Sequence, residues 1–247
     1  MNTKPFLILQ LRSGDVEADD EYHAILRYAG LSEEDTVRIR MEQDTLPTVA
    51  LEAYAGVLVG GGPWNVSDPA EKQPPEQQQA EAWLLPLMQA IIKRDHPYLG
   101  MCYGLGILAQ ALGGTVSKER YGEAVGGVTL TRTTAGANDP LTATLSESFR
   151  GFCGHKEAVQ ALPPHSTLLV TGTACPIQMI RTGTHVYATQ FHTELDAAGI
   201  EIRVNAYRNH GYFKPDEVSA IIEVGYRETV HEPMRILHTF VERYRTG

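Results

Sequence analysis

Apolar positions along the chain follow two different spacings. Short apolar runs bounded by glycine or polar residues predict strands, whereas apolar residues three and four positions apart predict helices. In the first hundred residues the predicted strands are Phe6–Leu11, Thr36–Met41, Ala55–Val59 and Pro97–Met101. Later strands are predicted at Gly126–Thr131, Thr167–Thr171, Ile177–Ile180 and Val186–Gln190.

Helices are predicted between these strands and again in the C-terminal third. They cover about Asp19–Tyr28, Leu105–Leu112, Ala197–Arg208 and Pro215–Tyr226, followed by a last helix with the stripe Leu237, Phe240, Val241 and Tyr244. One more helix carries the stripe Leu84, Leu87, Met88 and Ile91. Pro86 falls inside it and predicts either a kink or a helix that restarts near Leu85.

The order of these elements predicts the fold class. Strands that alternate with helices predict an α/β fold with a mostly parallel central sheet and helices on both faces. The run of strands after residue 126 predicts an added antiparallel portion. No repeat or linker divides the sequence, so residues 1–247 are expected to form a single domain. Its motif-bearing core would span about 50–196, with a helical C-terminal extension at about 197–247.

Composition argues against several classes of protein. The chain is 43% hydrophobic and 21% charged, as is usual for globular domains. A formal net charge of −9 without a compensating basic block argues against nucleic-acid binding. No apolar stretch is long enough to cross a membrane, and Phe6–Leu9 is too short for a secretory leader. The three cysteines fit no zinc motif. We therefore expect a cytoplasmic enzyme or binding protein without metal or cofactor.

Gly100-Met101-Cys102-Tyr103-Gly104 joins a predicted strand to a predicted helix. A residue on such a turn has strained backbone torsions, and small residues on either side relieve crowding, as at the elbow that holds a nucleophilic serine. The helix directs free N–H groups and its positive end at the Cys102 sulfur, which favours a thiolate. Taken alone, the pattern fits a buried structural cysteine equally well.

Gln190-Phe191-His192-Thr193-Glu194 follows another predicted strand. A cysteine nucleophile needs an imidazole that moves protons and a carboxylate that fixes the tautomer of the ring. His192 and Glu194 are two positions apart, so both project to the same side of an extended segment. By itself, a His-x-Glu pair at a strand end more often lies at a solvent-exposed edge and has no catalytic role.

Gly60-Gly61-Gly62-Pro63 ends a third predicted strand. Glycines at this place let backbone N–H groups approach a ligand closely. The spacing is not G-x-G-x-x-G and no helix begins directly afterwards, which argues against a dinucleotide site. An oxyanion hole fits better, and a turn without chemistry is the alternative.

In combination, the three motifs resemble the class I glutamine amidotransferases, and most of all the amidotransferase domain of GMP synthase. Further resemblance lies in Leu112-Gly113-Gly114, Gly154-His155-Lys156-Glu157-Ala158-Val159 and Cys175-Pro176-Ile177-Gln178. The resemblance covers roughly residues 50–196. It implies the fold of that family, which is flavodoxin-like, with a mostly parallel sheet and an added antiparallel portion.

The resemblance also implies roles for single residues. Cys102 would be the nucleophile, His192 the general acid and base, and Glu194 the group that orients His192. The backbone N–H groups of Gly62 and Tyr103 would form the oxyanion hole. The substrate-binding residues would be Gly61, Gly106, His155 and Gln190.

Two positions depart from the family pattern. Relatives usually carry glutamine where this chain has Gly106, and proline where it has Thr193. A turn can form without proline. The change at Gly106 removes a hydrogen-bonding side chain from the expected substrate pocket. We therefore expect weak hydrolysis of free glutamine, and stronger hydrolysis in a Gly106→Gln variant if the pocket has room.

The resemblance implies hydrolysis of the γ-carboxamide of glutamine, or of a γ-glutamyl amide, through a Cys102 thioester. Most family members pass ammonia to a synthetase that uses ATP, and this sequence carries no Walker motif. A glutaminase subunit for a separate ATP-dependent synthetase is therefore one expectation. A stand-alone γ-glutamyl hydrolase or peptidase is the alternative. A non-catalytic binding protein is a third, against which the intact triad argues.

Two remaining features lie near the motifs in the sequence. Cys153 and His155 form a Cys-x-His pair that offers two metal ligands without a third, so no metal site is predicted. Tyr121-Gly122-Glu123 predicts a solvated loop.

Overall fold

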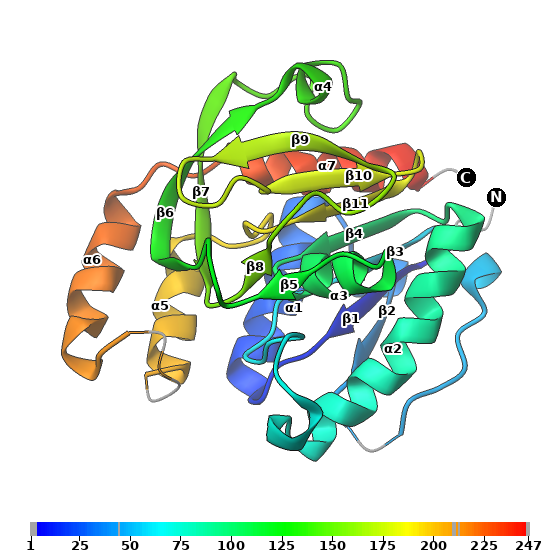
Figure 1. The fold of residues 1–247 in the computed structure, drawn as a ribbon, viewed down its shortest axis with the longest axis horizontal. Coiled ribbons are helices and arrows are strands. Elements are labelled where there is room, and N and C mark those ends of the chain that lie inside the picture. The colour runs from blue at the N-terminus through cyan, green and yellow to red at the C-terminus, as the bar shows by residue number, and fades with distance from the viewer. Residues whose placement is uncertain (1–3, 44, 209–210, 212, 246–247) are drawn as a thin grey trace.

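A nine-stranded sheet forms the centre of the computed structural model, which describes residues 4–43, 45–208, 211 and 213–245. Its strand order is β2-β1-β3-β4-β11-β10-β9-β6-β7 (Figure 1). The strands are β1 (Phe6–Gln10), β2 (Thr36–Arg40), β3 (Gly56–Val59), β4 (Tyr98–Met101), β6 (Glu123–Arg132), β7 (Ser148–His155), β9 (Ser166–Gly172), β10 (Met179–Thr182) and β11 (Val186–Thr189). A small second sheet pairs β5 (Val116–Ser117) with β8 (Ala158–Val159).

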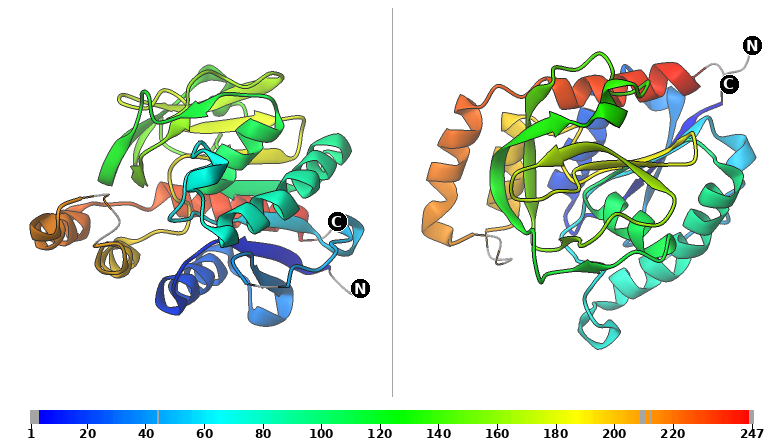
Figure 2. Two further views of the ribbon diagram at one scale, coloured as in Figure 1. Left: turned by 60° about the horizontal axis from the view of Figure 1, so that its bottom comes forward. Right: turned by 45° about the horizontal axis from the view of Figure 1, so that its top comes forward.

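Seven α-helices lie in the part of the chain that the structure describes. They are α1 (Asp15–Ala29), α2 (Pro75–Arg94), α3 (Tyr103–Ala111), α4 (Thr134–Ala137), α5 (Ala197–Ala206), α6 (Val218–Arg227) and α7 (Glu232–Tyr244). Figures 1 and 2 show α5 and α6 at one side of the molecule, beside β6 and β7. None of the described helices is both long enough and apolar enough to span a bilayer.

The predicted fold class is confirmed. β2, β1, β3, β4 and β11 are parallel neighbours, and β10, β9, β6 and β7 continue the sheet in antiparallel pairs. Successive side chains of β1 point to opposite faces of the sheet. Phe6 and Ile8 join the core formed with α1 and α7, whereas Leu7 and Leu9 join the core formed with α2 and α3. A strand buried on both faces explains the continuous apolar run in the sequence.

The boundaries of the predicted strands agree with the structure within three residues. Strand β7 has no counterpart among the predictions, because Gly151 and Gly154 weaken the strand pattern. It forms through antiparallel pairing with β6 along most of its length. Glu123, expected in a solvated loop, is the first residue of β6 and pairs with His155.

The prediction of a helix that restarts near Leu85 is wrong. Helix α2 runs without interruption from its first-turn proline at position 75, with Pro86 inside it. Pro86 lacks the N–H for one helical hydrogen bond. Buried side chains before and after it pack on the sheet and hold the helix together: Leu84, Leu87, Met88 and Ile91.

The C-terminal helices take part in the main core. Phe240 of α7 contacts Phe6 of β1, with ring centroids 6.4 Å apart. Ile236, Leu237 and Val241 belong to the same buried cluster as the apolar residues of α1. Residues 197–247, expected as an extension, therefore include a helix that covers one face of the parallel strands.

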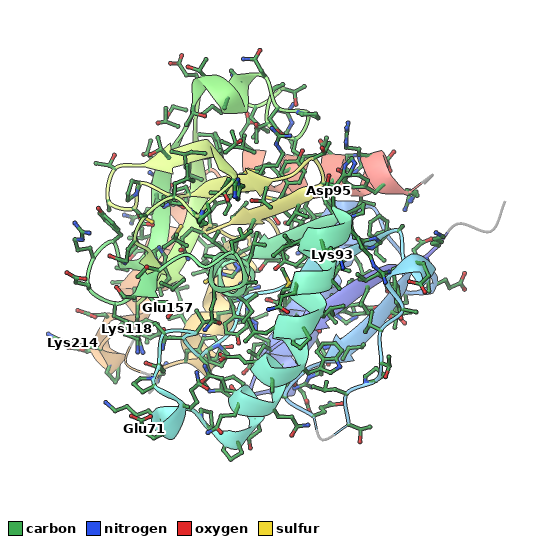
Figure 3. All side chains as sticks on the ribbon, turned by 45° about the vertical axis from the view of Figure 1, so that its right-hand side comes forward. Glu71, Lys93, Asp95, Lys118, Glu157 and Lys214 are labelled. Carbon is green, nitrogen blue, oxygen red and sulfur yellow. The ribbon has the colours of Figure 1, made fainter. Side chains whose placement is uncertain are left out.

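Asp95 links the turn before β4 to the turn before β11. It ends α2 in a left-handed conformation with φ of 48°, and Figure 3 labels it at that end of the helix. Its carboxylate accepts hydrogen bonds from the N–H groups of Thr184 and His185 at 2.9 to 3.0 Å. This contact ties the turn before β4 to the turn before β11, and the two strands pair in parallel up to Met101 and Thr189.

Cys102 occupies the sharp turn that the sequence predicts. It follows β4 directly, precedes α3, and has φ of 52° and ψ of −94°. A Cβ on Gly100 would lie 2.7 Å from the carbonyl carbon of Gly104, and a Cβ on Gly104 would lie 3.0 Å from the carbonyl oxygen of Val59. Both glycines are therefore required by close approach of backbone to backbone.

We expect Gly100→Ala to lower the free energy of unfolding by about 1–3 kcal/mol, because overpacking at this turn forces backbone shifts. Urea denaturation of the purified variant measures this directly. An unfolding free energy equal to that of the parent would contradict the close approach described for Gly100.

Candidate active site

Cys102 and the Gln190–Glu194 segment meet at one edge of the sheet. They follow β4 and β11, which are parallel neighbours, so the carboxyl ends of the two strands lie together. The Cys102 N–H donates to the Thr189 carbonyl at 2.7 Å. The Gln190 side-chain amide lies 3.8 Å from the Cys102 sulfur. Two residues that the sequence places 88 positions apart are thus neighbours.

His192 and Glu194 form the predicted pair. His192 Nδ1 lies 2.7 Å from Glu194 Oε1. Because a carboxylate only accepts hydrogen bonds, we assign the hydrogen to Nδ1, which leaves Nε2 as the basic nitrogen. The His192 N–H also donates to the Phe152 carbonyl at 3.0 Å. Thr193, at the position of the usual proline, is buried and its hydroxyl contacts Met101 Sδ at 2.9 Å.

A buried chain of charges continues behind this pair. Arg203 Nη2 lies 2.8 Å from Glu194 Oε1, and Arg203 Nη1 lies 3.0 Å from His192 Nδ1. Glu21 lies 3.7 Å from Arg203 and forms a second ion pair with Arg12. Glu21 and Glu194 are completely buried. We call these residues the buried charge network: Arg12, Glu21, His192, Glu194 and Arg203.

The sequence analysis missed Glu21 and Arg203, although both leave a signal. Arg203 lies on the apolar stripe of α5, between the buried Ile200 and Val204. Glu21 likewise lies on the buried stripe of α1, beside Ala18 and other apolar residues. A charged residue on the buried face of a helix needs a partner, so such positions indicate an ion pair inside the protein.

The buried charge network sets the protonation states of the pair. Burial by itself would raise the pKa of Glu194, but His192 and Arg203 together hold it well below its usual value. For His192, burial lowers the pKa and outweighs the attraction of Glu194, and the Arg203 cation lowers the pKa further. At neutral pH the pair is therefore a carboxylate beside a neutral imidazole.

Burial raises the pKa of the Cys102 thiol to about 12, although the Arg12 cation opposes this. That the N-terminus of α3 favours a thiolate when Cys102 reacts remains a prediction. Cys102 rests as a thiol at neutral pH. A base must take its proton when the sulfur reacts.

The glycine run fits around His192 and Arg12. A Cβ on Gly61 would lie 2.6 Å from His192 Cε1 and 2.9 Å from Arg12 Nη2. A side chain at position 61 would therefore displace the imidazole. Gly61, predicted to bind substrate, lies against the buried charge network, whereas Gly62 lines the cavities at Cys102.

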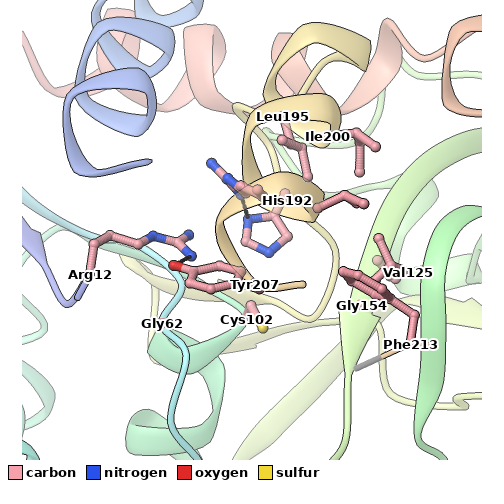
Figure 4. A pocket seen from close by; sticks show the side chains of 13 residues that line it. Arg12, Gly62, Cys102, Val125, Gly154, His192, Leu195, Ile200, Tyr207 and Phe213 are labelled. Atoms are coloured by element: carbon pink, nitrogen blue, oxygen red, sulfur yellow. Dashed lines mark hydrogen bonds between the residues drawn. The ribbon is translucent and has the colours of Figure 1, made fainter. Parts of the chain in front are cut away.

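Two cavities meet at Cys102, and Gly62, Cys102 and Gly154 line both. About 490 Å³ of atom-free space, open solvent included, lies in and in front of the His192 cavity, which is shown in Figure 4. The His192 cavity is also lined by Val125, Leu195, Ile200, Val204, Tyr207 and Phe213. The Gln190 cavity has about 360 Å³ on the same measure. Its other lining residues include Trp64, Asn65, Tyr103, Gly106, His155, Glu157 and Gln190.

The three predicted substrate-binding positions other than Gly61 therefore lie on one side of Cys102. Gly106, His155 and Gln190 all line the Gln190 cavity, and Tyr103 joins them. Tyr103 is the first residue of α3, so its N–H has no acceptor within the helix. Its hydroxyl donates to Glu81 at 2.9 Å, which fixes the ring away from that N–H.

Gly106 has little free space beside it. A Cβ at this position would lie 3.1 Å from Val66 Cγ2 and 3.5 Å from Glu157 Oε1. Glu157 is held there because its carboxylate accepts the N–H groups of Val66 and Ser67, both at 2.9 Å. A side chain at position 106 would therefore press on Val66, whereas its distance to Glu157 is an ordinary van der Waals contact.

Glu123 adds a third residue to the Cys153 and His155 pair. One ligand atom from each lies within 4.8 Å of the others. His155 Nε2 lies 2.9 Å from Glu123, and His155 Nδ1 lies 2.8 Å from the Glu157 carbonyl. Gln178 also donates to Glu123 at 2.7 Å. Both ring nitrogens already have protein partners, so the contacts describe a hydrogen-bond network that supports the wall of the Gln190 cavity.

We expect Arg203→Met to raise the pKa of His192, because the variant removes a cation that disfavours the imidazolium. Titration of the His192 ring by NMR measures the change. Arg203→Lys is the matched control, since it keeps the charge. A His192 pKa that is the same in the Met variant and in the parent would contradict the electrostatic role given to Arg203.

Comparisons with known proteins agree with this geometry. The family model described as glutamine amidotransferase class-I matches residues 17–199. A glutamine-hydrolysing GMP synthase of Thermomicrobium roseum is 31% identical over 143 residues, which cover 57% of this chain and 23% of that protein. γ-Glutamyl peptidase 3 of Arabidopsis thaliana is 26% identical over 160 residues, which cover 58% of this chain and 56% of that protein.

The chain thus spans about a quarter of the length of the GMP synthase it matches. Its fold is also that of a crystal structure of a glutamine amidotransferase from Thermotoga maritima, with a TM-score of 0.76 and 20% identity. That alignment covers 98% of this chain and 99% of the other. Since the family model extends over most of the residues that build the sheet and the site, the chain belongs to the class I glutamine amidotransferase family.

Proposed function

We propose that this protein hydrolyses the γ-carboxamide of glutamine, or of a γ-glutamyl amide, through a thioester on Cys102. The observation that carries the proposal is the meeting of an elbow cysteine with the His192–Glu194 pair at the carboxyl ends of β4 and β11. Nucleophile, base and orienting carboxylate are the three groups that acyl transfer from an amide requires.

The first step forms the tetrahedral intermediate that precedes the thioester. Cys102 rests as a thiol, so His192 Nε2 takes its proton as the sulfur attacks the γ-carbonyl carbon. The carbonyl oxygen becomes an oxyanion, for which the N–H groups of Gly62 and Tyr103 are the proposed donors. Glu194 holds the ring and stabilises the imidazolium that forms. Each such oxyanion donor typically contributes about 3–4 kcal/mol to lowering the barrier.

The second step releases the amine and then glutamate. The carbon–nitrogen bond breaks and the imidazolium gives its proton to the departing nitrogen, which leaves as ammonia or as an amine. His192 next takes a proton from water, and the hydroxide attacks the thioester carbonyl. The carbon–sulfur bond breaks, the γ-carboxylate of glutamate leaves, and the proton returns to Cys102.

Two fates of the released nitrogen fit the family. The similarity to a glutamine-hydrolysing GMP synthase supports transfer of ammonia to an ATP-dependent synthetase as partner. The similarity to a γ-glutamyl peptidase supports a stand-alone γ-glutamyl hydrolase. Gly106 favours the second fate, because this position offers no side chain that could hydrogen-bond free glutamine.

We propose a reducing compartment, such as the cytoplasm, for this chemistry. Cys102, Cys153 and Cys175 are all free thiols. Cys102 must stay reduced to act as a nucleophile, and cytoplasmic thiols are kept reduced.

Cys102→Ser should abolish amide hydrolysis while the fold is kept, because a serine hydroxyl is far harder to ionise than a thiol. Glu194→Gln should leave partial activity, since the proton shuttle remains but its orientation is disturbed. Ammonia or amine release measures both, with circular dichroism as the check on folding. Full activity in Cys102→Ala would end the assignment of the nucleophile.

Gly106→Gln alone should not improve hydrolysis of free glutamine, because its Cβ would already lie 3.1 Å from Val66 Cγ2 and Val66 would have to move. This revises the expectation from sequence, which required room in the pocket. The double variant Gly106→Gln with Val66→Ala makes that room and should hydrolyse glutamine better than the single variant. Val66→Ala by itself is the control. A single variant that is clearly faster than the parent would contradict the crowding described here.

A further inference from the structure

The two cavities at Cys102 differ in chemistry. Apart from the residues they share, the Gln190 cavity has the polar side chains of Asn65, His155, Glu157 and Gln190 in its wall, next to apolar ones such as Trp64 and Val159. Those of His155 and Glu157 are held by hydrogen bonds within the protein. The His192 cavity presents hydrocarbon from β6, from α5 and the segment just before it, and from the segment before α6: Val125, Leu195, Ile200, Val204 and Phe213. In Figure 4, His192 lies between Arg12 and the side chains of Val125 and Phe213.

The proposed reaction assigns one cavity to each half of the substrate. His192 returns a proton to the departing nitrogen, so that nitrogen must leave on the side of the imidazole. The acyl half then extends from Cys102 to the opposite side, where Tyr103 and Gln190 lie. The amine half of a γ-glutamyl amide would accordingly occupy the His192 cavity.

The charged residues of the His192 cavity are already paired. Arg12 pairs with Glu21, and Arg203 pairs with Glu194, so two guanidinium groups face two carboxylates within the buried charge network. Tyr207 accepts a hydrogen bond from Arg12 at 3.2 Å. A charged amine half would lose hydration on entry without gaining an unpaired ion of opposite sign.

The apolar wall is the open side of a packed cluster. Leu195, Ile200 and Val204 belong to a buried group with Phe152 and Met234, and Phe213 and Val125 pack against its edge. The cluster holds these side chains in place behind the cavity, so the wall is preformed hydrocarbon beside a general acid. Ammonia would gain nothing from such a wall, whereas an apolar chain would leave water for it.

From this asymmetry we infer that the protein prefers γ-glutamyl amides of apolar primary amines, with the glutamyl half in the Gln190 cavity and the hydrocarbon in the His192 cavity. The inference rests on the proposed function and adds the class of leaving group. The amine departs neutral after it takes the proton from His192, and no co-reactant other than water is consumed.

A homologous substrate series tests the inference on the purified full-length chain. L-Glutamine is compared with its γ-N-methyl, ethyl, propyl and butyl amides, and with γ-glutamylglycine as a charged compound of similar size. Each buried methylene should raise kcat/KM roughly fourfold until the cavity is filled. γ-Glutamylglycine should fall below the propyl amide, because its carboxylate finds no unpaired cation.

A matched pair of variants tests whether the apolar wall of the His192 cavity causes the preference for alkyl amides. Val125→Thr keeps the β-branched shape and puts a hydroxyl on the wall, so the ratio of kcat/KM for the butyl amide to that for glutamine should fall roughly three- to thirtyfold. Val37→Thr makes the same change on β2, where Val37 is exposed, and should leave the ratio as in the parent.

Different outcomes of these experiments distinguish the inference about the leaving group from the proposed function. If glutamine is cleaved at least as well as the alkyl amides, the inference is overturned while the proposed function stands. If no γ-glutamyl compound is cleaved and a diazoketone analogue of glutamine does not label Cys102, the proposed function fails as well. A rise along the alkyl series that Val125→Thr reduces and Val37→Thr does not would support the inference.

Discussion

Burial of five ionisable groups in one connected network is the constraint on which the site depends. Two carboxylates, Glu21 and Glu194, are removed from water, and each is paired with a guanidinium from another element. Leaving one such group without its partner costs about 3–5 kcal/mol. The segments after β1 and β11 and the helices α1 and α5 are therefore held at fixed distances from one another. His192 can take a single orientation within that frame, with its basic nitrogen turned away from Glu194.

The elbow at Cys102 supplies the second half of the arrangement. Its left-handed backbone and the close approach of Gly100 and Gly104 fix the sulfur at the start of α3. Parallel pairing of β4 with β11 then decides which residues the sulfur meets. Because burial keeps the sulfur protonated, its reactivity depends on His192, and the two halves of the site work only together. The position of the base also distinguishes the two cavities, since the amine departs on its side.

Local sequence patterns predicted the parallel sheet and the sharp turn at Cys102, because both depend on short-range spacing. The roles of Cys102, His192 and Glu194 were implied only by the family resemblance, since the local His-x-Glu pattern alone favours a solvated strand end. Local patterns did not predict the contacts of Arg203, which lies nine positions after Glu194 and reaches it only when α5 packs against the sheet. Pro86 misled the helix prediction because tertiary packing outweighs the missing hydrogen bond. The crowding at Gly106 likewise comes from Val66, which lies forty positions earlier in the chain and is brought there by the fold.

Direct observation of the covalent intermediate tests the central claim most sharply. The parent protein is mixed with a γ-glutamyl amide, quenched in acid within milliseconds to seconds, digested and analysed by mass spectrometry. The account predicts a γ-glutamyl group on the peptide that contains Cys102, appearing before glutamate accumulates and absent from the peptides of Cys153 and Cys175. Turnover without any acylated Cys102 peptide, or acylation at another residue, would contradict it.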